Sequence, residues 1–280
     1  GHDVIILSRQ IKESDNPKLS FALWNTDNNT IDINAVAKSD YIINLAGEGV
    51  ADKRWSEKRK KAIADSRTKS CALIVNTLRN NANKIKAVIN ASAIGWYGSD
   101  TDNGKAFTED MPPANDFFGK TCKAWEGSID PVTSLGKRLV KIRVGMVLGK
   151  EGGALKEFAK PLRFGIAAVL GSGKQIQSWI HIDDICRIFI YALENESMSG
   201  VYNGVAPKPV DCKTVVTTIA KKIKGSFYIP VYVPSFVLKI MLGEVSSELL
   251  KSVTVSPAKI RNAGFQFIFP SIEAAVNDLV

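Results

Sequence analysis

The chain has 280 residues, 45% of them hydrophobic and 23% charged, which is typical of a globular protein large enough to bury a sizeable core. No apolar run approaches the ~20 residues of a membrane-spanning helix, and the first residues lack the basic segment of a signal peptide. Four scattered cysteines without a C-x-x-C pair indicate reduced thiols in a cytoplasmic protein, and the two histidines lie far apart. We therefore expect neither a disulfide framework nor a metal site.

The formal net charge of +9 makes nucleic acid a partner to consider. The basic residues are densest at 53–61, where Glu57 interrupts them, and the apolar spacing that follows indicates a helix. We interpret this block as the solvated face of that helix, with a nucleotide phosphate as the alternative ligand. The expected partner is an unidentified small-molecule substrate, with no nucleic acid and no membrane, and the oligomeric state is left open.

Residues 1–150 alternate between short buried strands and helices. Strands are expected at 4–7, 21–24, 41–45, 87–92 and 139–144, and helices at 31–37, 55–78 and 117–130. The polar, proline-rich residues 99–114 should form a surface loop. This alternation predicts βαβ units and, with right-handed crossovers, an α/β fold built on a Rossmann-type doubly wound parallel sheet.

Beyond Gly149 the chain becomes richer in glycine and in loop residues. Asp183 or Asp184 is expected to cap a helix that runs to 193, and a last strand is expected at 201–205. Short helices with several prolines follow. We therefore expect a Rossmann domain at 1–150, completed by 180–206, and a smaller α/β lobe on the substrate side, made of 151–179 and 207–280.

The apolar run at 41–45 ends in two small residues, Ala46 and Gly47. Small residues at the carboxyl end of a parallel strand let a flat ligand approach the backbone, and this edge is where open α/β sheets bind ligands. A buried core strand followed by a tight turn is the alternative interpretation.

Ser8 and Arg9 end the first strand that the sequence shows. At the end of the second strand of a dinucleotide-binding sheet, an acid binds the ribose hydroxyls, whereas an arginine accommodates a 2′-phosphate. Arg9 therefore favours NADP over NAD, because guanidinium matches phosphate as a bidentate fork; a solvated surface arginine is the alternative. The glycine-rich loop that cradles a pyrophosphate should precede Gly1, so we expect this chain to lack the first strand and that loop.

Motifs spread along the whole chain resemble those of one family. In order, they are Leu7-Ser8-Arg9, Asn44-Leu45-Ala46-Gly47-Glu48, Arg54-Trp55, Ser66-Arg67, Ser92-Ala93-Ile94-Gly95, Tyr97-Gly98, Trp125-Glu126, and the stretches 143–149, 178–184, 202–207, 242–244 and 263–270. The set resembles the epimerase-like atypical short-chain dehydrogenase/reductases, often described as predicted nucleoside-diphosphate-sugar epimerases with a C-terminal domain of unknown function.

The resemblance implies an extended short-chain dehydrogenase/reductase fold that binds NADP(H). It assigns cofactor contacts to Ser8, Arg9, Leu45, Ala46, Arg67 and Val147. The first two would hold the 2′-phosphate, the next two the adenine–ribose side and the last the nicotinamide, while Arg67 would add a charge from the long helix.

The resemblance does not supply a catalytic set. Extended relatives use a serine and then Tyr-x-x-x-Lys on the next helix, and here Phe118, Cys122 and Ala93 stand at the tyrosine, lysine and serine positions. The catalytic residues are therefore unknown. Substitute candidates are Ser92, Glu48, Tyr97 and His181. The last three are expected on loops that border one cleft, and each has an alternative interpretation as a packed or hydrogen-bonded structural residue.

Two functions fit these residues. The first is an NADP(H)-binding, epimerase-like oxidoreductase that acts on a nucleotide sugar or a small carbonyl compound. The alternative is an NADP(H)-binding sensor or interaction protein without the usual Ser/Tyr/Lys catalysis. A nucleic-acid binder ranks last, because no recognised binding motif accompanies the basic block.

Overall fold

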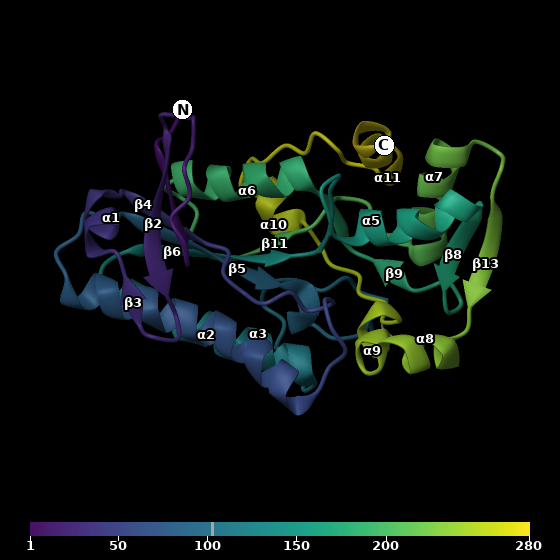
Figure 1. Cartoon of the computed structure of the whole chain (residues 1–280), viewed down its shortest axis with the longest axis horizontal. Coiled ribbons are helices and arrows are strands. Elements are labelled where there is room, and N and C mark those ends of the chain that lie inside the picture. Colours follow the sequence, from purple (N-terminus) through teal and green to yellow (C-terminus); the bar gives the residue numbers. More distant parts are fainter. Residues whose placement is uncertain (102–103) are drawn as a thin grey trace.

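A four-stranded parallel sheet forms the centre of the computed structural model, which describes residues 1–101 and 104–280 (Figure 1). Its strand order is β11 (Gly200–Gly204), β6 (Arg138–Val144), β5 (Ala87–Ala93) and β4 (Tyr41–Asn44). The predicted α/β parallel sheet is confirmed. Of the loop expected at 99–114, residues 102–103 lie outside the described residues.

The N-terminal strands form a separate sheet. In it, β1 (Val4–Ser8) runs parallel to β2 (Leu19–Asn25), and β3 (Thr30–Ile31) is antiparallel to β2. Because Ile31 pairs with β2 and Asp32 caps the next helix, α1 (Ile33–Lys38) begins later than predicted. In the part of the chain that the structure describes, no ladder joins β1 to β4.

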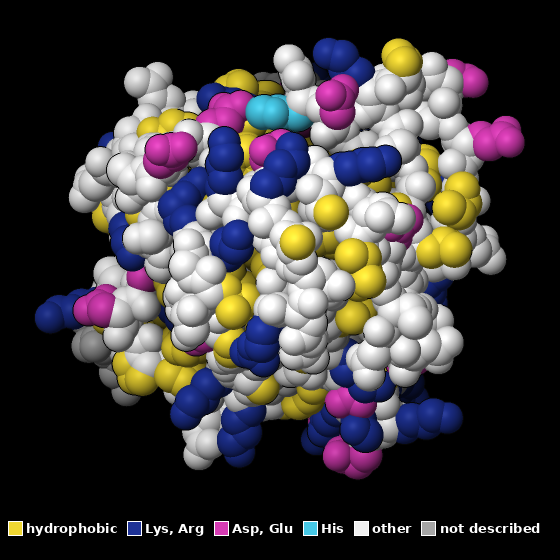
Figure 2. Space-filling view, turned by 90° about the vertical axis from the view of Figure 1, so that its left-hand side faces the viewer, with side chains coloured by type: hydrophobic (Ala, Val, Ile, Leu, Met, Phe, Trp, Pro, Cys, Tyr) yellow, Lys and Arg dark blue, Asp and Glu magenta, His cyan; other side chains and the backbone are white. Residues whose placement is uncertain are grey.

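Apolar side chains of β1 in the N-terminal sheet and of β4 in the central sheet are exposed. Val4 and Ile6 of β1 and Ile43 of β4 all lie in contact with solvent. Figure 2 shows this side of the molecule, where hydrophobic side chains appear between scattered Lys and Arg side chains.

Helices cover both faces of the central sheet. In Figure 1, α2 (Glu57–Asn80) and α3 (Phe117–Ile129) lie below it and α6 (Ile182–Glu194) above it. The strands between them are apolar, and Val88, Ile89, Val140 and Ile142 are fully buried in the main core. Burial on both faces explains why these strands read as continuous apolar runs.

The long helix α2 begins at Glu57, two residues later than predicted. Ser56 precedes it in extended conformation, and its side chain accepts a hydrogen bond from the Arg59 N–H at 3.2 Å. A serine cap of this kind satisfies a backbone donor that the first helical turn leaves free. Part of the basic block around it is paired, since Lys61 binds Asp65 and Arg59 binds Glu48, each at 2.8 Å.

The remaining residues add a second core cluster around short strands. The strand pairs are β7 (Met146–Leu148) with β10 (Trp179–His181), β9 (Ile176–Gln177) with β12 (Val210–Asp211), and β8 (Ile166–Leu170) with β13 (Ile229–Val233). The further helices are η1 (Ile94–Trp96), α4 (Pro131–Ser134), α5 (Ala154–Ala159), η2 (Lys160–Phe164), α7 (Cys212–Lys224), α8 (Ser235–Leu242), α9 (Val245–Leu249), α10 (Ala258–Asn262) and α11 (Ile272–Leu279). None of the helices in the described ranges has the length and apolar character needed to cross a bilayer.

Candidate functional site

The turn after β4 is held by a buried amide. Asn44 accepts a hydrogen bond from the Ala46 N–H at 3.2 Å through its side-chain oxygen, and its amide nitrogen donates to Asn90 at 2.6 Å. Both asparagines are buried, so the turn is anchored to the neighbouring strand β5. Leu45 points outward with 64% of its surface exposed. The carboxyl end of β4 therefore presents an open apolar side chain next to small residues.

Arg67 lies beneath this turn. Its Nη1 donates to the carbonyl oxygens of Glu48 at 3.1 Å and Ile63 at 2.9 Å, and its guanidinium stacks on the Trp125 ring at 5.0 Å. A methyl group at Gly47 would lie only 3.0 Å from the Arg67 Cζ, which explains the glycine. Burial lowers the pKa of Arg67, but arginine remains charged at neutral pH. A fixed positive charge thus supports the end of β4.

Ser8 and Arg9 lie at the carboxyl end of β1. The Ser8 hydroxyl accepts a hydrogen bond from the Gln10 N–H at 3.4 Å, and Ser8 is half-buried. Arg9 is exposed, and its guanidinium has no hydrogen-bond or ion-pair partner among residues 1–101 and 104–280. An exposed guanidinium at a strand end is available to an anion.

The residues at the usual catalytic positions pack against the end of β5. The Cys122 thiol lies 3.7 Å from the carbonyl oxygen of Ala93, and the Phe118 ring packs 5.1 Å from the ring of Trp55. Phe118 and Cys122 are four residues apart on α3 and therefore share one face. Burial, with the nearby Glu126 carboxylate, raises the pKa of Cys122 to about 12. Neither side chain can exchange a proton near neutral pH.

Ser92 and Tyr97 belong to a buried network centred on an ion pair. Arg143 donates to both carboxylate oxygens of Glu126, at 2.8 and 3.1 Å, and both residues are buried. Ser92 donates to the same carboxylate at 2.7 Å. Tyr97 accepts a hydrogen bond from Arg143 at 3.0 Å and donates to Asn203 at 2.7 Å. Both candidate hydroxyls are therefore fully engaged within the protein.

Burial raises the pKa of Tyr97 to about 12, although the Arg143 charge acts in the opposite direction. Its phenol is therefore neutral over the physiological range. We expect Tyr97→Phe to lower the free energy of unfolding by about 1–3 kcal/mol, because Asn203 and Arg143 each lose a buried partner. Urea denaturation measures this loss, and a titration with NADPH should show unchanged affinity. An abolished affinity would instead make Tyr97 a cofactor contact.

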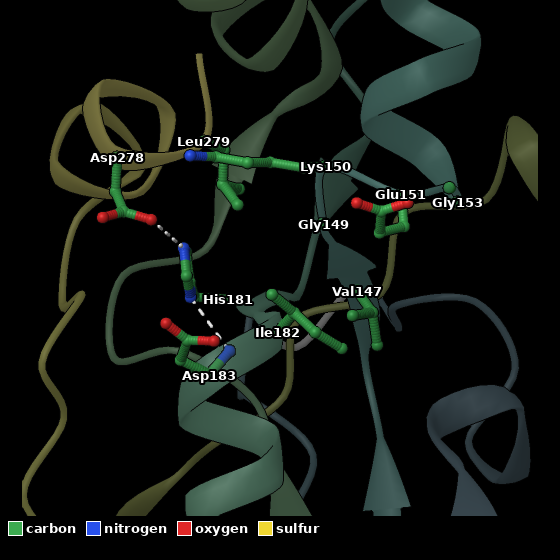
Figure 3. Close-up of a pocket in the computed structure, with 11 residues that line it drawn as sticks. Val147, Gly149, Lys150, Glu151, Gly153, His181, Ile182, Asp183, Asp278 and Leu279 are labelled. Carbon is green, nitrogen blue, oxygen red and sulfur yellow. Dashed lines mark hydrogen bonds and ion pairs between the residues drawn. The ribbon is translucent and has the colours of Figure 1, made fainter. Parts of the chain in front are cut away.

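His181 lies at the junction of β10 and α6, beside a cavity of about 500 Å³ (Figure 3). Its Nδ1 accepts a hydrogen bond from the Asp183 N–H at 3.0 Å, and its Nε2 lies 3.3 Å from an Asp278 carboxylate oxygen. The ring is fully buried and stacks on Phe269 at 3.7 Å. Since Nδ1 accepts, the proton of the neutral ring sits on Nε2 and faces Asp278.

The helix cap predicted at Asp183 or Asp184 is wrong, because His181 provides it. Asp184 is buried and instead accepts hydrogen bonds from the N–H groups of Ile268 and Phe269, both at 2.9 Å. The side chains of His181, Asp183 and Asp278 are close enough to hold a cation. A metal ion would need a free lone pair on Nε2. Because Nδ1 accepts the cap hydrogen bond, Nε2 carries the ring proton, so these three side chains do not fit a metal ion.

The structure brings only some of the predicted site residues together. Val147 and His181 line the same cavity, whereas Tyr97 and Ser92 share the buried network. Glu48 is exposed and pairs with Arg59. Sequence reasoning missed the central role of Arg143, although a charged residue within a buried strand was the signal that could have found it.

Two family models match the chain. Residues 1–126 match the NAD dependent epimerase/dehydratase family, and residues 233–279 match a domain of unknown function, DUF1731. The epimerase family protein YfhF of Bacillus subtilis is 34% identical over 281 residues, which cover 100% of this chain and 90% of that protein. The chain belongs to the epimerase family. Its fold and its place in an NAD(P)-binding family are thereby established.

Other relatives support the same conclusion. The chloroplastic SDR39U1 homolog of Arabidopsis thaliana is 33% identical, covering 88% of this chain and 70% of that protein. A solved structure of human epimerase family protein SDR39U1 with NADPH superposes with a TM-score of 0.83 and 28% identity, covering 100% of this chain and 91% of that one. A nucleoside-diphosphate sugar epimerase from Corynebacterium glutamicum gives a TM-score of 0.73 and 26% identity, covering 95% of this chain and 51% of that one.

Proposed function

We propose that this protein binds NADP(H) in preference to NAD(H). The observation that carries the proposal is the exposed, unpaired guanidinium of Arg9 at the end of β1, within the described ranges. A bidentate guanidinium suits the 2′-phosphate that only the phosphorylated cofactor carries. The human relative of matching fold was solved with NADPH, which supports the same cofactor.

The other proposed cofactor contacts follow the family pattern. Leu45 and Ala46 would line the adenine–ribose side, since Leu45 is the open apolar group at the end of β4. Arg67 would supply its fixed charge from below the turn, and Val147 would lie against the nicotinamide from the cavity beside His181. When bound, the cofactor would supply hydride chemistry.

Among the two candidate functions, the geometry favours an NADP(H)-binding sensor or interaction protein without Ser/Tyr/Lys catalysis. Phe118 and Cys122 lack an exchangeable proton near neutral pH. The hydroxyls of Ser92 and Tyr97 are hydrogen-bonded within the buried network. His181 is sealed from solvent and caps α6. None of these five side chains is therefore placed to act as general acid or base.

The second candidate is an oxidoreductase acting on a nucleotide sugar or a small carbonyl compound. The Corynebacterium glutamicum relative named a nucleoside-diphosphate sugar epimerase favours it. In either case we propose a small-molecule partner, no nucleic acid and a cytoplasmic location. The four free cysteines agree with a reducing compartment.

The proposal is tested by titrating the protein with NADPH and with NADH, following the reduced nicotinamide by fluorescence. We expect NADPH to bind at least about tenfold more tightly, which is the minimum that one good charge-assisted contact provides. Equal affinities would contradict the role of Arg9. Incubation of the NADPH-loaded protein with small aldehydes, and of the NADP⁺-loaded protein with nucleotide sugars, then separates the two candidates. Oxidation of NADPH by an aldehyde, or reduction of NADP⁺ or epimerisation of the sugar, would favour the oxidoreductase.

A further inference from the structure

The two-stranded parallel sheet β8–β13 is covered on one face along β8, and apolar residues of its other face are exposed where the two strands begin. Ala167 and Val169 of β8 are fully buried and pack into the second core cluster with α7. The alternate residues form the other face, and all of them are apolar: Ile166, Ala168, Leu170, Ile229, Val231 and Val233. Ile229 is 70% exposed on that face. Parallel strands are normally covered on both faces, so this one is unusual.

Two aromatic side chains extend this other face at the edge where β8 and β13 begin. Phe164 is 70% exposed and Phe227 is 87% exposed. Their segments lie side by side, because the Ile229 N–H donates to the Gly165 carbonyl oxygen at 2.9 Å. In Figure 1 this sheet forms the right-hand edge of the molecule, with α7 on one side of it. Exposed apolar side chains gathered in one place in this way are typical of an interaction site.

The charges near this face are mainly positive, although Lys160 is paired with Glu157. The two segments that build it, 158–182 and 212–243, contain no Asp or Glu. Their charged residues are Lys160, Arg163, Lys174, Lys213, Lys221, Lys222, Lys224 and Lys239. Arg163 stacks on the Phe164 ring at 4.6 Å, and three of the lysines end α7 just before Phe227. Exposed aromatic rings are thus flanked by cations.

The exposed aromatic rings and the neighbouring cations together indicate what binds to this surface. A second copy of the chain would bring the same positive charges against each other, at a cost in electrostatic free energy. An anionic lipid surface instead offers hydrocarbon for the rings and phosphates for the lysines. We propose that the β8–β13 surface, defined by Phe164, Phe227, Ile229 and the lysines at 221, 222 and 224, lies on membranes that contain anionic lipid.

Contact of this surface with lipid headgroups differs from spanning the membrane, which the sequence argues against. The expectation of no membrane partner rests on the absence of a long apolar run, which only a spanning helix requires. A surface that rests on headgroups needs only a few exposed apolar side chains and several cations. The inference does not depend on the cofactor, because the surface shares no residue with the proposed NADP(H) contacts.

The test is co-sedimentation with unilamellar vesicles, made either of phosphatidylcholine alone or of equal parts phosphatidylcholine and phosphatidylglycerol. We expect the protein to sediment with the mixed vesicles, little with the neutral ones, and less as salt rises. The triple variant Lys221→Gln, Lys222→Gln, Lys224→Gln should weaken partition up to about a hundredfold, since each lysine near the surface contributes about fivefold. Phe164→Ser with Phe227→Ser should weaken it at least about tenfold.

Matched controls alter exposed residues elsewhere. Ile11→Ser removes another exposed apolar side chain, and the triple variant Lys12→Gln, Lys38→Gln, Lys123→Gln removes the same charge; both should bind as the parent does. Circular dichroism verifies that each variant is folded. Equal sedimentation with both vesicle types, or equal loss in the controls, would overturn the proposal. So would a dimer in solution that Phe164→Ser with Phe227→Ser converts to monomer, because a second copy would then be the occupant.

Discussion

Replacing Glu126 by glutamine is expected to lower the free energy of unfolding by about 3–5 kcal/mol, a large share of the 5–15 kcal/mol typical of a native domain. Arg143 would then be a buried guanidinium without a carboxylate. Among the described residues, its side chain otherwise contacts the Glu109 carbonyl, the Tyr97 hydroxyl and the aromatic faces of Trp96 and Tyr97. Burial alone would lower the pKa of Arg143, and the Glu126 carboxylate raises it overall. Urea denaturation at neutral pH measures the effect.

An exposed ion pair provides the matched control for Glu126→Gln. Lys61 and Asp65 are 2.8 Å apart on α2, with three-quarters of the Lys61 side chain exposed. Asp65→Asn should cost less than about 1 kcal/mol, because solvent screens the pair. Adding Arg143→Met to Glu126→Gln should restore part of the lost stability, since the isolated charge is removed. A loss for Glu126→Gln no larger than that for Asp65→Asn would show that the buried pair is not a stabilising centre.

The central sheet was predictable because its signals are local. The strand β5, for example, combines an apolar run with small residues at its end, and both features lie within a few positions of each other. The start of α2 shows the limit of the same reasoning. Trp55 fits the apolar spacing of the helix, but the Ser56 side chain competes for the backbone, and the helix begins at Glu57, two residues later than predicted.

The buried network was not predictable from spacing, because its members are far apart in the chain. The bond from Tyr97 to Asn203 joins positions 106 residues apart, and the bond from Ser92 to Glu126 joins positions 34 apart. From the sequence alone, Ser92 and Tyr97 were candidates for chemistry. Only the three-dimensional pairing of β5, β6 and β11 shows that the hydroxyls saturate a buried ion pair.

The strand β13 was missed for a different reason. Pro230 is its second residue, and a proline normally argues against a strand because it cannot donate to a ladder. Among the described residues, the strand is hydrogen-bonded to β8 alone, so the proline nitrogen can face the free edge. Edge position thus overrides the local signal, and it also leaves the apolar face of β13 without a cover.

Arg9→Ala is expected to weaken NADPH binding by about 10–100-fold and to leave NADH binding unchanged. A charge-assisted hydrogen bond to a phosphate is worth about 1.5–3 kcal/mol, which corresponds to this range. Because Arg9 is exposed and bound to no other described group, its removal should not disturb the fold. Arg9→Lys should recover only part of the affinity, since an ammonium group cannot form the bidentate fork.

Arg79→Ala is the control, because Arg79 is also exposed but lies in the last turn of α2, away from the end of β1. It should bind both nucleotides as the parent protein does. The preference for NADPH should also shrink as salt increases, because added ions screen an exposed guanidinium from a phosphate. If Arg9→Ala instead weakened both nucleotides equally, the arginine would contact a part of the cofactor that both share, and the discrimination would have to come from another residue. If neither nucleotide lost affinity, the Arg9 guanidinium would be a solvated surface group and the preference for the phosphorylated cofactor would lack its physical basis.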